Sequence, residues 1–203
     1  MAKDIQGKLL KKQRDFRLQA LKFVSNITMA LNMFLKKVKH GSNINFWGIA
    51  YIVRYPGSSI SIGSRCSFRS DRNSNMIGLN RHCMVSTHSA NAKIIIGENC
   101  GFSGTVLGAK ERIVIGNDVL FGANTLITDF DWHGVAPDKR RNYSGDSKEI
   151  IIGNNVFIGY GSVVLKGVTI GDNSVIGANS VVTKNIPANV IAGGNPCKVI
   201  KEL

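Results

Sequence analysis

The sequence has few of the residues that mark several common protein classes. It contains only 4 prolines, and its 4 cysteines never form a C-x-x-C pair. The cysteine spacing of a small zinc-stabilised domain is therefore missing. The N-terminus does not resemble a secretory signal peptide, so we expect a reduced, cytoplasmic setting with free thiols.

A membrane-spanning helix is also not expected. The most apolar N-terminal stretch is interrupted by Lys22, Asn26 and Asn32. A span needs about 18 apolar residues without such interruptions. The 203 residues are enough for one domain and an appended segment.

Positive charge is concentrated at the N-terminus. Of the net charge of +13, residues 1–40 contribute +8 (ten Lys or Arg against two Asp), and residues 41–203 contribute +5 (sixteen against eleven). A nucleic-acid-binding surface combines clustered basic residues with a recognition motif, and the larger part of the chain has neither. We therefore expect no nucleic-acid partner.

What the sequence does contain is a six-residue repeat. Aliphatic residues recur at every sixth position near the C-terminus, glycine follows four of them, and small residues stand four positions later. The aliphatic positions are Ile152, Ile158, Val164, Ile170, Ile176 and Val182, and the small ones are Val156, Ser162, Val168, Ser174 and Ser180. This period predicts a parallel β-helix, in which three short strands make one coil and equal positions stack.

The same register continues toward the N-terminus. It passes through Ile62, Phe68, Ile96, Phe102, Ile115, Phe121 and Ile127, with a weaker start at Ile77-Gly78. We expect about six coils from Ile62 to Val182, at about 18 residues each. Aliphatic side chains fill the prism, and glycine or asparagine supplies the backbone angles of the corners. A β-sandwich would not keep a strict period of six, and a propeller would repeat at about 40 residues.

Three cysteines fall within this register. Cys66 and Cys100 take small inward positions, and Cys83 takes an aliphatic position. A buried free cysteine behaves as a small apolar residue, so we expect structural rather than nucleophilic roles.

The repeat is interrupted between Ile127 and Ile152, which predicts a loop within residues 129–149. Long loops on rigid scaffolds often carry function. His133 lies in this loop, and a side chain that titrates near neutrality suits removal of a proton from an attacking hydroxyl.

The neighbours of His133 admit more than one interpretation. Asp129 and Asp131 could orient the imidazole or bind an acceptor, and Trp132 could stack on a sugar ring. Equally, His133 and the two aspartates could be solvated, and Trp132 could fix the loop to a neighbouring subunit.

The stretch from Trp132 to Pro137, with Arg140, resembles the catalytic-loop motif of the maltose, galactoside and nodulation-factor acetyltransferase group. The likeness extends roughly from residue 94 to the C-terminus and is most specific over residues 150–200. Across the full chain, the sequence is most similar to acyltransferases of bacterial surface-polysaccharide biosynthesis. This resemblance implies a left-handed β-helix, a homotrimer, acetyl-CoA as acyl donor without a metal, and His133 as general base.

The resemblance also implies a coenzyme groove between subunits. Main-chain groups at two corners would hold the pantetheine arm, two further residues would contact its distal part, and two lysines would meet the phosphates. The pantetheine arm would bind to Tyr160 and Ala178, its distal part to Thr183 and Lys184, and the phosphates to Lys198 and Lys201. The N–H of Tyr160 would also stabilise the thioester oxyanion.

Two departures from the family pattern stand out. Lys198 and Lys201 occupy positions where arginine is common, and a lysine lacks the bidentate fork of arginine. An acceptor-binding asparagine of the sugar acetyltransferases falls near Ser103-Gly104, which makes Ser103 a candidate acceptor contact.

The N-terminal segment has a helical apolar stripe. Its members recur at steps of three and four and are flanked by lysines: Phe16, Ala20, Phe23, Ile27, Leu31, Phe34 and Val38. The stripe could pack on the β-helix or on a trimer mate, which we favour, or it could bind an anionic membrane surface.

These observations predict an all-β protein with an N-terminal helix. Residues 1–40 form a basic amphipathic helical segment, residues 41–59 a cap, and residues 60–203 the β-helix with the 129–149 loop and a C-terminal tail. The predicted function is O-acetylation of a sugar hydroxyl, with a glycan acceptor and the chain itself as partners. The alternatives are N-acetylation of an amino sugar, an assembly protein without catalysis, and a metal-dependent hydratase.

Overall fold

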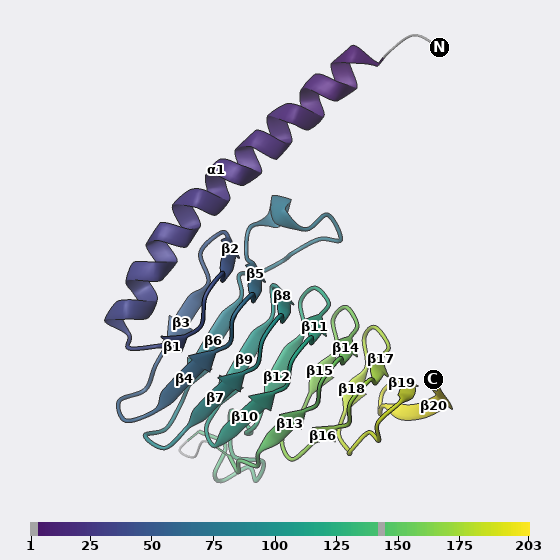
Figure 1. Cartoon of the computed structure of the whole chain (residues 1–203). Helices are drawn as coiled ribbons and strands as arrows, with labels where there is room; N and C mark the ends of the chain where they lie inside the picture. The colour runs from purple at the N-terminus through teal and green to yellow at the C-terminus, as the bar shows by residue number, and fades with distance from the viewer. Residues whose placement is uncertain (1–3, 142–144) are drawn as a thin grey trace.

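The computed structural model describes residues 4–141 and 145–203. One long helix, α1 (Ile5–Leu35), precedes a three-sided prism of stacked short strands (Figure 1). The strands belong to three sheets, which we name A, B and C.

From β1 to β18, each sheet contains every third strand, so the chain visits A, B and C in turn. Sheet A contains β1 (Lys39–His40), β4 (Ser59–Ile62), β7 (Lys93–Ile96), β10 (Arg112–Ile115), β13 (Ile150–Ile152) and β16 (Thr169–Ile170). Sheet B contains β2 (Asn45–Trp47), β5 (Ser67–Arg69), β8 (Gly101–Ser103), β11 (Leu120–Phe121), β14 (Phe157–Ile158), β17 (Val175–Ile176), β19 (Val190–Gly193) and β20 (Lys198–Glu202). Sheet C contains β3 (Tyr51–Val53), β6 (Met84–Thr87), β9 (Val106–Ala109), β12 (Leu126–Thr128), β15 (Val163–Val164) and β18 (Val181–Val182).

Neighbouring strands in each sheet are parallel and aligned in register, except that β20 runs antiparallel to β19 at the C-terminal end. Apart from Ile77, the predicted inward positions are buried, as Ile152, Ile158 and Val164 illustrate. Four phenylalanine rings continue this ladder inside sheet B: Phe46, Phe68, Phe102 and Phe121, with centroids 4.6–5.1 Å apart. The six-residue period is therefore confirmed as the period of the core.

The start of the prism differs from the prediction. Residues 41–59 do not cap the first coil; together with β1 they form it, because β2 and β3 pair with β5 and β6. Six complete coils thus run from β1 to β18, and the helix α1 covers the open end instead.

One register assignment was also wrong. Ile77 is 60% exposed and takes no part in the core, because residues 70–83 leave the prism as a second loop. Cys83 re-enters at a small corner position, where its carbonyl accepts from the N–H of Tyr51 at 2.9 Å, and Val85 takes the aliphatic position. Cys66 and Cys100 fill small inward positions as predicted.

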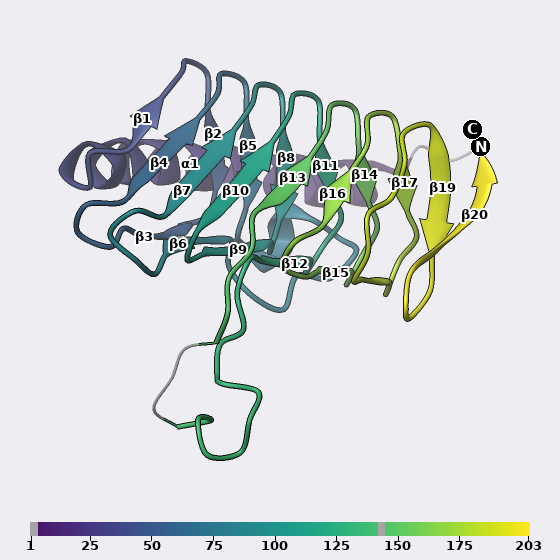
Figure 2. The same cartoon turned by 90° about the horizontal axis from the view of Figure 1, so that it is seen from below.

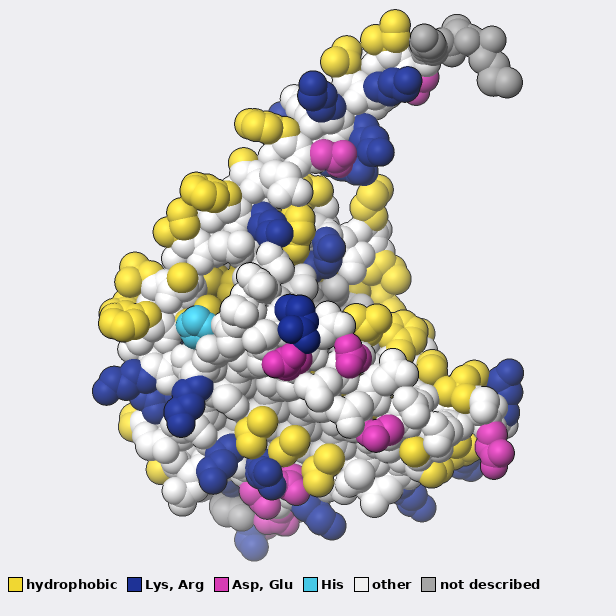
Figure 3. Space-filling view, in the orientation of Figure 1, with side chains coloured by type: hydrophobic (Ala, Val, Ile, Leu, Met, Phe, Trp, Pro, Cys, Tyr) yellow, Lys and Arg dark blue, Asp and Glu magenta, His cyan; other side chains and the backbone are white. Residues whose placement is uncertain are grey.

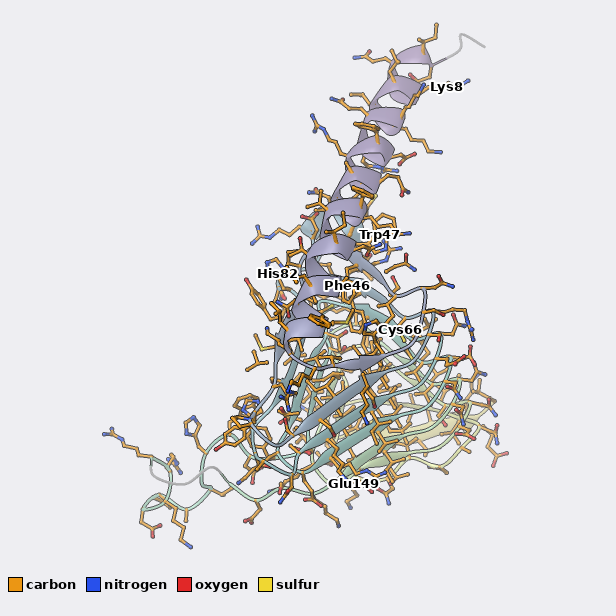
Figure 4. All side chains as sticks on the ribbon, turned by 60° about the vertical axis from the view of Figure 1, so that its left-hand side comes forward. Lys8, Phe46, Trp47, Cys66, His82 and Glu149 are labelled. Carbon is orange, nitrogen blue, oxygen red and sulfur yellow. The ribbon has the colours of Figure 1, made fainter. Side chains whose placement is uncertain are left out.

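Helix α1 is joined to the first coil by its C-terminal half. Asp4 caps its N-terminus by accepting from the N–H of Gly7 at 2.8 Å. Farther along, Asn26 accepts from the N–H of Phe46 at 2.7 Å, and Ser25 accepts from that of Gly48 at 3.1 Å. Figure 4 shows Phe46 and Trp47 beside this part of the helix.

The face of α1 that packs is not the predicted stripe. Ser25, Met29 and Met33 are buried against the prism, whereas Phe16, Phe23, Ile27, Leu31 and Phe34 are 59–78% exposed. Of the predicted stripe only Val38 is buried, and it lies beyond the end of the helix. Figure 3 shows hydrophobic side chains along the outer margin of the helix. Within residues 4–141 and 145–203, no helix combines the length and hydropathy of a transmembrane segment.

Candidate functional site

The corners of the prism place the predicted site residues. We call the turn from a sheet B strand to the next sheet C strand the B–C corner, and the turn from C to A the C–A corner. The 129–149 loop leaves a C–A corner, between β12 and β13, and extends away from the prism (Figure 2). Its residues 142–144 lie outside the described part of the chain.

The base of the 129–149 loop is a short antiparallel ladder. Phe130 pairs with Ser147, the N–H of Asp131 donates to Asp146 at 3.1 Å, and the N–H of Lys148 donates to Asp129 at 2.8 Å. These bonds make the stem of the loop an extension of the prism rather than a free segment.

Asp129 anchors this stem. Its carboxylate has no exposed surface and accepts from the N–H groups of Lys110, Glu111 and Arg112 at 2.6–2.9 Å. Burial raises the pKa of the carboxyl despite these three bonds. A direct contact between Asp129 and an acceptor does not fit this burial, because the fold already uses both oxygens.

Trp132 packs on its own chain. Its ring lies 4.7 Å from Phe130 and 4.9 Å from His88, and it covers Gly108, where an added Cβ would approach the indole to 3.1 Å. His88 also bonds Ser86 at 2.9 Å through Nε2, and burial lowers the pKa of His88. Trp132 as a whole remains 46% exposed.

His133 follows directly and is exposed. Its Nδ1 lies 3.2 Å from the carbonyl oxygen of Arg140, on the returning part of the loop. A proton on Nδ1 would donate to that carbonyl and leave Nε2 as the basic nitrogen. Arg140 also donates to the carbonyl of Val135 at 3.3 Å, so the turn around His133 is held internally.

Asp131 reaches back to the prism. Its carboxylate forms an ion pair with Lys166, which lies at the next C–A corner, between β15 and β16. Both side chains are about one-third exposed. The pair ties the segment that carries His133 to the coil that follows the loop.

The predicted coenzyme residues lie in three different places. Tyr160 and Ala178 lie at successive B–C corners, whereas Thr183 and Lys184 lie at a C–A corner. Lys198 and Lys201 are exposed on β20, beyond the last coil.

The successive B–C corners stack along one edge of the prism, and we call this edge the B–C rail. A Cβ added at Gly122 or Gly159 would lie 2.6 Å from the main-chain nitrogen of the next corner, Tyr160 or Ala178. Among the described residues, no backbone acceptor lies within hydrogen-bond distance of the N–H of Tyr160 or of Ala178. Two successive N–H groups on this rail are therefore available to a ligand.

Ser103 lies on the same rail, two coils before Tyr160. It is only 8% exposed, and its hydroxyl accepts from the side-chain amide of Asn75 at 3.1 Å. Asn75 belongs to the 70–83 loop, which contains the short helix η1 (Arg72–Ser74). The repeat pattern does not predict this loop, because Ile77-Gly78 imitates one unit of the repeat.

Within one chain, His133 and the Tyr160–Ala178 rail therefore lie at different corners of the prism. His133 shares its corner with Thr183 and Lys184. A complete site that uses all the predicted residues requires the C–A corner of one chain to face the B–C corner of another. Among the described residues, no group of three or more His, Cys, Asp or Glu side chains is arranged to hold a metal ion.

The fold and these corners define a class: a parallel β-helix of hexapeptide repeats with a histidine-bearing loop extruded at one corner. Comparison with known proteins agrees with this. Residues 149–184 match the family model of the bacterial transferase hexapeptide (six repeats), and residues 112–136 match that of the hexapeptide repeat of succinyl-transferase.

Two relatives and one solved structure illustrate the likeness. The galactoside O-acetyltransferase of Lactococcus lactis is 50% identical over 45% of this chain and 44% of its own length. That of Escherichia coli is 45% identical over 57% of each chain. The N-acyltransferase AntD of Bacillus cereus, solved as a mutant with dTDP and coenzyme A, superposes with a TM-score of 0.63 at 23% identity, over 83% of this chain and 86% of that one.

The chain has the left-handed β-helix fold of acyltransferases such as AntD, and its residues 112–136 and 149–184 match hexapeptide-repeat family models. It spans about half the length of the two galactoside acetyltransferases that it matches.

Proposed function

We propose that the protein transfers an acetyl group from acetyl-CoA to a hydroxyl of a sugar. The observation that carries this proposal is the exposed imidazole of His133 on an internally bonded loop, with Nδ1 held by a carbonyl. Nε2 takes the proton of the acceptor hydroxyl as its oxygen attacks the thioester carbonyl. The C–S bond then breaks, and the proton is delivered to the coenzyme thiolate, which leaves as the thiol.

The rail of the B–C corners supports the donor side of this proposal. A thin, extended pantetheine arm fits along Tyr160 and Ala178, whose N–H groups have no backbone acceptor among the described residues. The N–H of Tyr160 would stabilise the oxyanion that forms during attack. Lys198 and Lys201, exposed on β20, would meet the phosphates as point charges.

The acceptor is proposed to be a glycan of a bacterial surface polysaccharide or its precursor. The likeness to galactoside O-acetyltransferases supports a sugar hydroxyl. Transfer to an amino sugar is the second candidate, favoured by the fold shared with an N-acyltransferase. The two reactions differ in acceptor but use the same base and donor.

We also propose that the chain acts as a homotrimer. The C–A corner with His133, Thr183 and Lys184 would meet the B–C rail of a neighbouring copy, so that three equal sites form around a threefold axis. The exposed stripe of α1 is proposed to contact an anionic membrane surface, where lipid-linked glycan precursors reside.

The test of the catalytic proposal is the release of thiol from acetyl-CoA with a panel of sugars. His133→Ala should lower kcat at least about a hundredfold, the usual contribution of a general base. Its melting temperature should stay that of the wild type, because the side chain is exposed. His40→Ala, at an exposed histidine in the first coil, is the matched control and should remain fully active. Full activity of His133→Ala would exclude the proposed base.

A further inference from the structure

The 70–83 loop covers the start of the B–C rail. Strand pairing places Gly104, Asn124, Gly161 and Asn179 at successive B–C corners. Arg81 lies across the first two of these corners. Its Nε donates to the carbonyl of Gly104 at 3.0 Å, and its guanidinium also donates to the carbonyls of Asn124 and Thr125.

The loop is fixed to the rail by further bonds. The side chain of Asn124, which is only 7% exposed, accepts from the N–H of Asn80 at 3.1 Å and donates to the carbonyl of Gly78 at 2.9 Å. Asn75 donates to Ser103 at 3.1 Å. The loop is therefore a built part of the corner, although it interrupts the repeat.

Two cavities adjoin this loop and share three residues, Asp71, Arg72 and Asn73. One, of about 280 Å³, is further lined by Asn80, Arg81 and His82 among others. The other, of about 680 Å³, lies between the loop and α1 and is further lined by Arg14 and Arg17 among others.

The lining is rich in positive charge. Four arginines and one aspartate, Asp71, line the two cavities, and Asp71 already accepts from the N–H of Asn73 at 2.8 Å. Carbonyl acceptors hold Arg81 but do not neutralise its charge. Guanidinium groups recognise carboxylates and phosphates through paired hydrogen bonds.

The position of the cavities relates them to the proposed reaction. Tyr160 lies two coils from Gly104 along the same rail, which is about 10 Å at the spacing of neighbouring strands. A donor whose phosphates lie at β20 and whose pantetheine follows Ala178 and Tyr160 would present its acyl group toward the 70–83 loop. The acceptor would then meet the donor from the side of this loop.

We infer that the cavities beside the 70–83 loop form an acceptor subsite for an anionic sugar, one that carries a carboxylate or a phosphate. Arg72, shared by both cavities, and Arg17 on α1 bind the anionic group. This inference rests on the proposed acetyl transfer for its catalytic consequence, while anion binding at the site is a separate property.

The experiment combines binding with turnover. Isothermal titration measures inorganic phosphate, glucuronate and glucose 1-phosphate binding to the full chain without donor. Thiol release from acetyl-CoA is then measured with glucose, glucuronate and glucose 1-phosphate. The variants are Arg72→Gln and Arg17→Gln, both at exposed side chains. The matched control is Arg65→Gln, at an exposed arginine that pairs with Glu98 at 2.6 Å on a different corner.

We expect the wild type to bind phosphate, and Arg72→Gln to weaken this binding about tenfold or more, since a charge-assisted contact is lost. In turnover, the KM for the charged sugar should rise by the same factor, while kcat and the KM for acetyl-CoA stay constant. Arg65→Gln should match the wild type. Comparison of glucuronate with glucose 1-phosphate decides between a carboxylate and a phosphate.

The inference would be overturned by anion binding that Arg72→Gln leaves unchanged, or by no anion binding by the wild type. Equal use of glucose and its charged derivatives would also contradict an anion-selecting subsite, while leaving acetyl transfer intact. Arginine-dependent anion binding without thiol release from any acceptor would instead reject the proposed function and keep the site.

Discussion

At the scale of single residues, the 129–149 loop is stabilised by pairs that join it to the prism. Trp132 packs on His88 and Phe130, Asp129 is bonded by three N–H groups, and Asp131 pairs with Lys166. The position of His133 depends on these contacts, because its own bond to Arg140 lies within the loop. Loop position should therefore respond to the protonation of groups that never touch a substrate.

His88 provides a test of this dependence. Burial holds its pKa below the ordinary value of 6.5, so the neutral imidazole is the form that the fold favours. Because this pKa is lowered, neutral His88 stabilises the folded protein fully above pH 6.5. This stabilisation is lost as the pH falls through the folded-state pKa of His88. Below that value the charged ring should loosen the packing of Trp132.

The measurement is Trp132 fluorescence in a Trp47→Phe background, which leaves one of the 2 tryptophans. We expect a shift of emission toward longer wavelength on acidification, with a midpoint below 6.5. His88→Gln should remove this transition and serves as the control for the nearby carboxylates. A midpoint at or above 6.5 would contradict the burial of a neutral His88.

At the scale of elements, α1 presents two different faces. Its C-terminal half packs through Met29 and Met33, while large apolar side chains project from the other side along its whole length. Between Ile5 and Leu35 it carries six Lys or Arg and one Asp, a net charge of +5. An exposed apolar face on a basic helix is typical of segments that lie in the interface of an anionic bilayer.

The exposed face of α1 leads to a prediction. The triple change Phe16→Ser, Phe23→Ser and Phe34→Ser should abolish co-sedimentation with phosphatidylglycerol vesicles. Burial of each phenylalanine contributes about 1.5–3 kcal/mol to such binding. The melting temperature should change little, since all three rings are at least 68% exposed.

The control is Gln6→Ser with Gln19→Ser, which changes exposed polar residues of the same helix. Binding should also be weaker to neutral phosphatidylcholine vesicles and at high salt. If the stripe packs on another copy instead, the triple change should lower the mass measured by light scattering. The wild type should then not bind to vesicles.

Helix α1 also shows a feature that the sequence pattern does not predict, namely which of its faces packs. Steps of three and four identify the stripe of Phe16, Phe23 and Phe34, but periodicity alone does not say which face packs. Here two methionines and a serine form the packed face, since flexible methionine side chains fit an irregular coil end. The strand period, in contrast, determines the buried side chains directly, because an inward position in a narrow prism has no alternative.

The same contrast applies to the site. His133 is predicted because it stands in a break of the repeat, and its exposure is compatible with the proposed role as base. Asp129 could not be distinguished from a solvated loop charge, because its three N–H partners are 17–19 residues earlier in the chain. The 70–83 loop was not predicted, because Ile77-Gly78 matches the repeat by chance.

At the scale of the whole molecule, a three-sided prism separates groups that the proposed chemistry must unite. His133, Thr183 and Lys184 lie at C–A corners, whereas Tyr160 and Ala178 lie at B–C corners. The proposed cyclic trimer would solve this separation, because each interface can bring unlike corners of two copies together. No six-residue period reveals such an assembly, since it concerns surfaces outside the repeat.

Subunit complementation tests this arrangement. His133→Ala removes the base but keeps the rail. Ala178→Trp places a bulky side chain at an exposed corner of the rail and keeps the base. Each variant alone should be inactive, because every site in its trimer has the same defect, whereas Ala178→Ser should stay active.

Co-expression of the two variants should restore thiol release. If each site takes His133 from one copy and the rail from the next, a random trimer of equal parts gives about a quarter of its sites two intact halves. The co-expressed protein should therefore show about a quarter of the wild-type kcat per chain. If both halves came from the same copy, every chain would carry one defect and no activity would return, so inactive mixed trimers of the expected mass would contradict a site shared between subunits.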